Sequence, residues 1–185
     1  VATSLWYSSA KPIIKQPVFD CFPFNDELDL LELRFNELDS VVDRWVITEA
    51  PITHSGQPKP LYFKENIDRF QKWIHKVTHI VVDDFQLDGL DGSDKHWAIE
   101  RHQRSAIMRG LESCLDDDII LIGDTDEIPN AEAVKKYQTS MGMACLEMKL
   151  YYGYMNLEGY EPWRWTRMLS YGMLKEMGPQ APCVA

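Results

Sequence analysis

Four short apolar segments recur along the first two thirds of the chain, and each has the length of a buried β-strand. They cover residues 18–22, 44–50, 79–85 and 118–123. Segments with helical spacing or turn-forming residues separate them. Strands that alternate with helices pair in parallel, because the chain must cross back over the sheet before each new strand begins. The pattern predicts an α/β fold with a mostly parallel sheet and helices on both faces.

Three segments carry the spacing of amphipathic helices. The first has apolar residues at 28, 31, 35 and 38, with Asn25 or Asp26 as its expected N-cap. The second has them at 67, 70, 74 and 77, and the third runs from about residue 96 to 113. Gly and Pro make the 51–63 connection irregular. After Asn130 we expect one more short helix and a strand-like aromatic segment at 145–155.

Length and charge limit the classes of function. A chain of 185 residues suits a single domain, which we place at 1–185. Its net charge of −10, without any run of Lys or Arg, makes nucleic acid an unexpected partner. No stretch approaches the roughly 20 apolar residues that span a bilayer, so we expect no membrane contact from the chain as given. The four cysteines, at 21, 114, 145 and 183, lack the spacing of a zinc site.

The segment DDDIILIGDTDEIP, at residues 116–129, ends an apolar run with a cluster of carboxylates. An extended backbone would present Asp124 and Asp126 to one shared cation, and hard oxygen ligands suit Mg²⁺ or Mn²⁺. Such an ion would link the protein to a diphosphate and stabilise charge on a departing phosphate. The alternative is structural, because Asp126 or Asn130 can cap the short helix that follows, with Pro129 in its first turn.

Further polar residues fall where the predicted strands end. Asp20, Glu49 and the pair at 83–84 belong to the first three strands or follow them. Ligands of open α/β sheets bind beyond the carboxyl ends of the strands, so these groups are expected at one crevice. On the third predicted helix Arg104 lies on a partly apolar face. It is either a phosphate clamp or a partner of Glu100 at the i−4 position.

Three ordered motifs then resemble a known family. They are FDCFPFNDELDLLELRFNELDSVVDRWVITEAPITHSGQPKPLYFKEN, WAIERHQRSAIMRGL and DDDIILIGDTDEIP. Together they are similar to glycosyltransferase family 17, whose members include the β-1,4-mannosyl-glycoprotein 4-β-N-acetylglucosaminyltransferases, over about residues 18–170. The resemblance implies a GT-A-type nucleotide-diphospho-sugar transferase fold and transfer of N-acetylglucosamine to a mannose of an N-glycan, in β-1,4 linkage with inversion. It also implies UDP-N-acetylglucosamine as donor, a glycan acceptor, a divalent cation (Mn²⁺ or Mg²⁺), and the Golgi lumen if an upstream membrane anchor exists.

The resemblance also implies roles for individual residues. Asp124 and Asp126 correspond to the metal and diphosphate carboxylates, and Gln103 and Arg104 occupy the "QR" pair expected to contact the donor. Asp20, with its neighbours to Phe22, and Glu49 match the nucleotide-facing edge. Thr53, Gly56 and Lys59 form the loop beside that edge.

The acceptor side is less defined by the sequence. Family members continue past TRMLSYGMLKE into a Gly-Trp-His segment that this chain lacks, so we expect the C-terminal part of the domain to be missing. The catalytic base stays unassigned among Glu127, Glu147, Glu158 and Glu161. An aromatic group is a candidate sugar-stacking wall or ordinary packing. It comprises Tyr151, Tyr152, Tyr154, Tyr160, Trp163 and Trp165.

Two other classes of function compete with a transferase. A haloacid dehalogenase-type phosphohydrolase also places DxD after a strand, with the first Asp as nucleophile. Ile128 and the central position of the motif disagree with that pattern. The other alternative is a non-catalytic protein that binds a sugar or a nucleotide.

Overall fold

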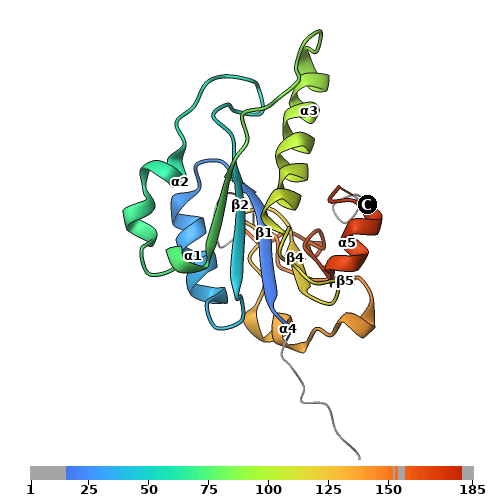
Figure 1. The fold of residues 1–185 in the computed structure, drawn as a ribbon. Helices are drawn as coiled ribbons and strands as arrows, with labels where there is room; N and C mark the ends of the chain where they lie inside the picture. The colour runs from blue at the N-terminus through green and yellow to red at the C-terminus, as the bar shows by residue number, and fades with distance from the viewer. Residues whose placement is uncertain (1–15, 152, 154–156, 181–185) are drawn as a thin grey trace, which may run out of the picture.

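The computed structural model of this chain describes residues 16–151, 153 and 157–180. Its centre is a six-stranded sheet with the order β3-β2-β1-β4-β6-β5 (Figure 1). The strands are β1 (Val18–Phe24), β2 (Arg44–Glu49), β3 (Val77–Val81), β4 (Ile119–Ile122), β5 (Ala144–Cys145) and β6 (Arg167–Ser170). The first four are mutually parallel, and β6 runs antiparallel to both β4 and β5. The predicted α/β class with a mostly parallel sheet is confirmed, in agreement with the fold expected of a glycosyltransferase domain.

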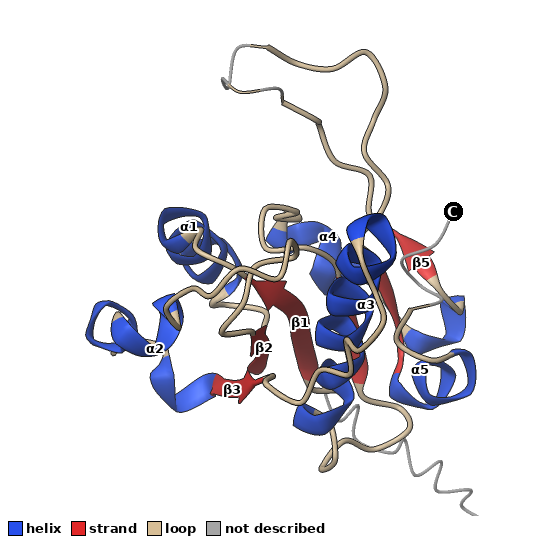
Figure 2. Cartoon of the chain, turned by 90° about the horizontal axis from the view of Figure 1, so that it is seen from above, coloured by secondary structure: helices blue, strands red, loops and turns tan. Residues whose placement is uncertain are grey.

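Helices cover both faces of this sheet. The α-helices are α1 (Leu28–Leu38), α2 (Tyr62–Glu65), α3 (Gly92–Ser105), α4 (Ala131–Lys136) and α5 (Tyr171–Met177). Single turns of 3₁₀-helix are η1 (Ile67–Phe70), η2 (Ile74–Lys76), η3 (Ala106–Gly110) and η4 (Thr139–Met141). Viewed from above, α1 and α2 lie on one side of the sheet, and α3 and α5 lie on the other (Figure 2).

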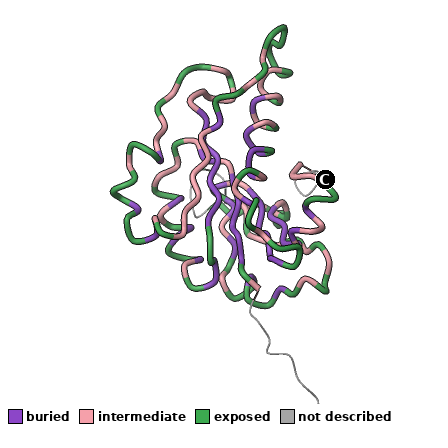
Figure 3. The backbone as a smooth tube through the Cα atoms, in the orientation of Figure 1, coloured by how far each residue is buried: buried purple, intermediate pink, exposed green. Residues whose placement is uncertain are grey.

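The two faces have separate cores because neighbouring residues of each strand point to opposite sides. Phe22 of β1 packs with Phe35 of α1 and Trp45 of β2 on one face. On the other face Cys21 of β1 packs with Ile107 of η3 and Leu174 of α5. The buried residues follow the central strands and the inner sides of the helices (Figure 3).

Strand β1 extends two residues beyond its predicted end at Phe22. Proline cannot donate to a sheet ladder, so Pro23 needs a place in β1 where no partner strand requires its N–H. In the structure β1 pairs with β4 only as far as Cys21, so one side of β1 is already an edge at Pro23. The missing N–H is tolerated there, and β1 continues beside β2 to Phe24.

The second predicted helix was wrong as a continuous element. Its residues form the separate turns η1 and η2, and Val77 already begins β3, while α2 precedes the predicted helix. The apolar spacing reflects burial and not one long helix, because Phe70 and Trp73 both pack around Phe35. The third predicted helix begins earlier than expected, at Gly92, and tightens into the 3₁₀ turn η3 after Ser105.

The expected cap of the first helix was also wrong. Glu27 occupies the N-cap position of α1 without a side-chain capping bond. Its carboxylate accepts instead from the backbone N–H groups of Asn25 and Asp26, each at 3.1 Å.

The expected aromatic strand is mostly absent from the described residues. Only Ala144–Cys145 joins the sheet as β5. The chain then extends as an arm, described at residues 146–151, 153 and 157–165, that stands away from the sheet (Figure 2). Two antiparallel bridges hold its sides together, Met148 with Trp163 and Tyr151 with Glu158. Tyr152 and Tyr154 lie outside the described residues. Within the described part of the chain, no helix has the length and apolar composition to cross a membrane.

Candidate functional site

A polar pocket of about 260 Å³ opens beyond the carboxyl ends of β1 and β4. The order of the sheet reverses between these two strands, since β2 and β3 continue on one side of β1 and β4 begins the other side. Such a switch point is where open α/β sheets bind ligands. The pocket is lined by Pro23, Phe24, Asn25, Glu27, His54, Glu100, Gln103, Arg104, Asp124, Thr125 and Asp126.

Both carboxylates of the DTD segment reach this pocket, as the sequence predicted. The side chain of Asp124 is 47% exposed, and one of its oxygens accepts from Arg104 Nη2 at 2.6 Å. Asp126 is exposed. Of the two residues in the capping alternative, Asn130 is the cap, because its side chain accepts from the N–H of Glu132 at 2.9 Å at the start of α4. Both members of the acidic pair thus remain directed at the pocket.

Gln103 and Arg104 reach the pocket from α3. Gln103 is nearly buried, and its Nε2 donates to the carbonyls of Phe24 at 3.2 Å and Thr48 at 2.9 Å. These two bonds fix α3 to the ends of β1 and β2. Arg104 lies 3.6 Å from Glu100 as well as 2.6 Å from Asp124. The predicted contact with Glu100 is thus present, and Arg104 also pairs with Asp124 of the acidic segment.

Asp20 lies below the pocket and does not line it. It is fully buried, and its two carboxylate oxygens accept from Arg34 Nε at 2.8 Å and Nη2 at 2.7 Å. Arg34 Nη1 donates in turn to the carbonyls of Asp124 and Glu127, both at 2.8 Å. The Asp20–Arg34 pair thereby holds the backbone of the acidic segment in place. Arg34 was missed in the sequence, although its position between Leu31 and Leu38 on the apolar face of α1 marked it as unusual.

Glu127 also serves the shape of the acidic segment. It is 7% exposed, and its carboxylate accepts from the N–H of Asp124 at 2.9 Å, from Thr166 Oγ1 at 2.9 Å and from Trp163 Nε1. Gly123 makes room for this arrangement, because a Cβ there would come within 2.6 Å of both Glu127 and Thr166. Three donors from separate segments hold this carboxylate, so its contacts are those of a structural support.

Glu49 is likewise buried away from the pocket. It accepts from the N–H of Phe63 at 2.9 Å and lies 2.9 Å from His79 Nε2. Lys59 Nζ lies 3.8 Å from Glu49 and donates to the carbonyl of Asn25 at 3.0 Å, while burial lowers the pKa of this lysine. Glu49 and Lys59 therefore connect the 51–60 loop to the sheet and to the segment after β1.

The 51–60 loop reaches the pocket through His54, and not through Thr53, Gly56 or Lys59. Burial lowers the pKa of His54, and the nearby carboxylate of Glu100 opposes that shift. A single histidine beside a Ser-Gly turn gave little signal in the sequence. Only the packing of this loop against α3 reveals its place.

The polar pair after β3 lies elsewhere. Asp84 accepts from Arg109 at 2.8 Å and lies 2.9 Å from His102, and both contacts lower the pKa of its carboxyl group. Neither Asp83 nor Asp84 lines the pocket.

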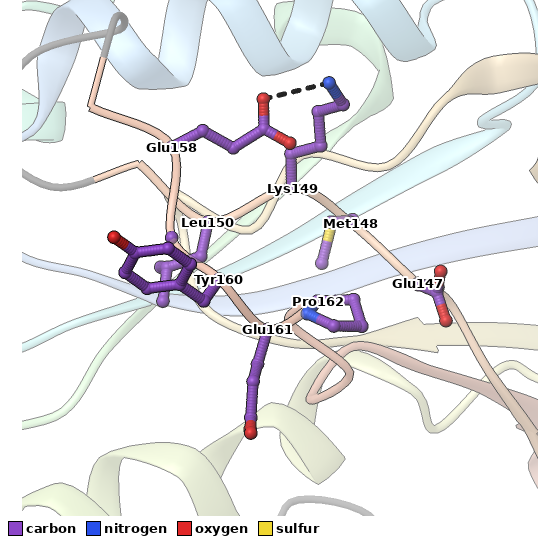
Figure 4. A pocket seen from close by; sticks show the side chains of 9 residues that line it. Glu147, Met148, Lys149, Leu150, Glu158, Tyr160, Glu161 and Pro162 are labelled. Carbon is purple, nitrogen blue, oxygen red and sulfur yellow. Dashed lines mark hydrogen bonds and ion pairs between the residues drawn. The ribbon is translucent and has the colours of Figure 1, made fainter.

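A second pocket, of about 300 Å³, lies on the arm (Figure 4). Three of the candidate bases, Glu147, Glu158 and Glu161, line it. Glu158 pairs with Lys149 at 3.0 Å, and Glu147 pairs with Arg164 at 2.7 Å. Tyr160 is fully exposed. The arm thus carries an exposed tyrosine and carboxylates apart from the first pocket, whereas Trp163 turns back to Glu127.

Comparison with known proteins shows the family of this chain. The family model described as glycosyltransferase family 17 matches residues 4–173. Proteins of rat, human and mouse named β-1,4-mannosyl-glycoprotein 4-β-N-acetylglucosaminyltransferase are each 29% identical to this chain over 170 residues. The match covers 89% of this chain and 27% of each relative, so the chain spans about a quarter of the relatives' length. The phosphohydrolase alternative gains no support from these matches. With the family model covering most of its length, the chain belongs to glycosyltransferase family 17.

Proposed function

We propose that this chain carries the nucleotide-sugar site of a transferase that moves N-acetylglucosamine from UDP-N-acetylglucosamine to a mannose of an N-glycan. A β-1,4 linkage, inversion at the anomeric carbon and a Golgi location belong to the same proposal, which follows the family and the names of the relatives. One observation carries it. Two carboxylates, a guanidinium and an amide converge on a single pocket at the switch point of the sheet.

The residues present fit a divalent cation and a diphosphate. Asp126 is exposed and Asp124 is half exposed, so both offer carboxylate oxygens to a hard ion such as Mn²⁺ or Mg²⁺. When bound, such an ion neutralises charge on the diphosphate as it leaves. The Asp20–Arg34 pair and Glu127 hold the backbone on which Asp124 and Asp126 stand.

Arg104 is the second group suited to the diphosphate. Its guanidinium already lies at the pocket surface beside Asp124, and a planar fork of N–H donors recognises phosphate oxygens well. A neighbouring phosphate would share this cation with Asp124. Gln103 keeps the helix that carries Arg104 fixed to the sheet, which supports this role for Arg104.

Transfer also requires a base for the acceptor hydroxyl. Among the candidates, Glu127 is occupied by three donors, and the other three lie on the arm. We therefore propose the arm as the acceptor side of the site and leave the base unassigned.

Binding of UDP to the intact chain tests the proposal. Titration calorimetry should show tighter binding with Mn²⁺ than with a chelator. Arg104→Gln should weaken binding in both conditions, because a guanidinium contact to phosphate is lost. Arg101→Gln is the matched control, since Arg101 is an exposed arginine on the same helix. If the UDP affinity were the same with Mn²⁺ and with a chelator, and were unchanged in Arg104→Gln, the assignment of this pocket would be refuted.

A further inference from the structure

Two histidines and a glutamate from separate segments meet at the edge of the pocket. His54 belongs to the 51–60 loop, and His96 and Glu100 lie one turn apart on α3. One ligand atom of each residue lies within 4.8 Å of the other two. His54 and Glu100 also line the pocket, but the set does not include Asp124 or Asp126. It is a group of donors separate from the acidic pair.

The 51–60 loop is built to hold His54 against α3. The N–H of Thr53 donates to the carbonyl of Gln57 and the N–H of Gly56 donates to the carbonyl of Thr53, both at 2.8 Å. Gly56 adopts φ +78°, and a Cβ there would lie 2.6 Å from Cε of Lys95 on α3. Glycine satisfies both the left-handed conformation and the close approach of the helix. The imidazole rings of His54 and His96 consequently lie 5.2 Å apart, edge to face.

Contacts with neighbouring residues also orient Glu100. Glu100 divides its oxygens, with Oε1 at 3.6 Å from Arg104 and Oε2 at 3.8 Å from His96. Supports of this kind fix the ligands of metal sites.

We propose that His54, His96 and Glu100 form a site for one transition-metal dication, with Zn²⁺ as the best match. Two imidazole nitrogens and one carboxylate oxygen are a known zinc donor set that leaves a fourth position for water or an anion, whereas Mg²⁺ prefers oxygen ligands throughout. Tetrahedral zinc ligands lie about 3.3 Å apart, so modest side-chain rotations close the set. The bound ion ties the 51–60 loop to α3 and so fixes one wall of the pocket.

Zinc titration of the intact chain tests this site. Calorimetry should give one tight site, and Co²⁺ in place of Zn²⁺ should develop visible absorption bands from imidazole coordination. His96→Gln and His54→Gln should each lower the Zn²⁺ affinity about tenfold or more, since even indirect ligand supports contribute that much. His102→Gln is the matched control, because His102 is a histidine of the same helix that pairs with Asp84 outside the cluster.

The outcomes separate this site from the proposed nucleotide site. Asp126→Asn should leave Zn²⁺ affinity unchanged, whatever it does to UDP. Circular dichroism of each variant shows whether the fold is retained, and Glu100→Gln provides a third ligand variant if one histidine variant unfolds. Wild-type Zn²⁺ affinity in folded His54 and His96 variants, or an equal loss in His102→Gln, would overturn the proposal. UDP binding is measured separately, so its failure does not affect this result.

Discussion

Arg34 and Asp20 form a bidentate ion pair in which both side chains are fully buried. The third nitrogen of the Arg34 guanidinium, Nη1, donates to the carbonyls of Asp124 and Glu127 in the acidic segment. The pair connects α1, β1 and the backbone that carries Asp124. A charge network of this kind stabilises one particular arrangement of the pocket, because either charge alone would be buried without compensation.

Removing Arg34 should therefore destabilise the fold strongly. We expect Arg34→Ala to lower the free energy of unfolding by about 3–5 kcal/mol, since Asp20 is left as an uncompensated buried charge. Urea denaturation measures this change. Arg69→Ala is the control, because Arg69 pairs with Asp29 and Glu32 at the surface and should change stability little. Equal stability of the two variants would contradict the role given to Arg34.

Replacing either carboxylate of the acidic pair should weaken UDP binding, but only one of the two replacements should lower the stability of the fold. Asp124→Asn and Asp126→Asn should each weaken Mn²⁺-dependent UDP binding about tenfold or more. Only Asp124→Asn should also cost stability, about 1 kcal/mol, because Asp124 neutralises the nearly buried Arg104. Calorimetry with and without a chelator, together with thermal unfolding, separates the two effects. Unchanged UDP binding in both variants would argue against metal ligation.

Glu127 should prove important for the stability of the fold. Glu127→Gln turns one acceptor into an N–H₂ group facing a donor, which should cost about 1–3 kcal/mol of stability. Glu161→Gln, on the exposed arm, should leave stability unchanged. Chemical denaturation of both proteins makes the comparison. If Glu127→Gln were as stable as the natural chain, the three-donor arrangement would not matter.

The cysteines should differ sharply in reactivity. Burial raises the pKa of Cys114 to about 12 and raises that of Cys21 well above its usual value. A raised pKa keeps these groups as unreactive thiols at pH 8, whereas Cys145 is exposed. Brief alkylation with iodoacetamide followed by peptide mapping should label Cys145 and spare Cys21 and Cys114 until denaturant is added. Labelling of Cys114 in the folded chain at the rate of Cys145 would contradict this.

Local patterns were enough to predict the sheet and the acidic segment. Apolar runs of strand length predicted the four parallel strands. A parallel sheet is covered on both faces, so its strands appear in the sequence as short apolar runs. The DTD segment was placed at the pocket correctly, since loops after parallel strands meet at one edge of a sheet. The broken second helix could not be predicted, because packing of Phe70 and Trp73 around Phe35 overrides helical spacing.

The tertiary structure alone decided which polar residues face the pocket. Asp20 and Glu49 stood in the expected strands, but their side chains are occupied by Arg34 on α1 and by His79 on β3. His54 and Glu100 reach the edge of the pocket because the 51–60 loop folds against α3. Sequence patterns determine where each strand ends, since these patterns depend on local burial. The partner of a polar side chain depends on contacts between residues far apart in the chain, and only folding brings those residues together.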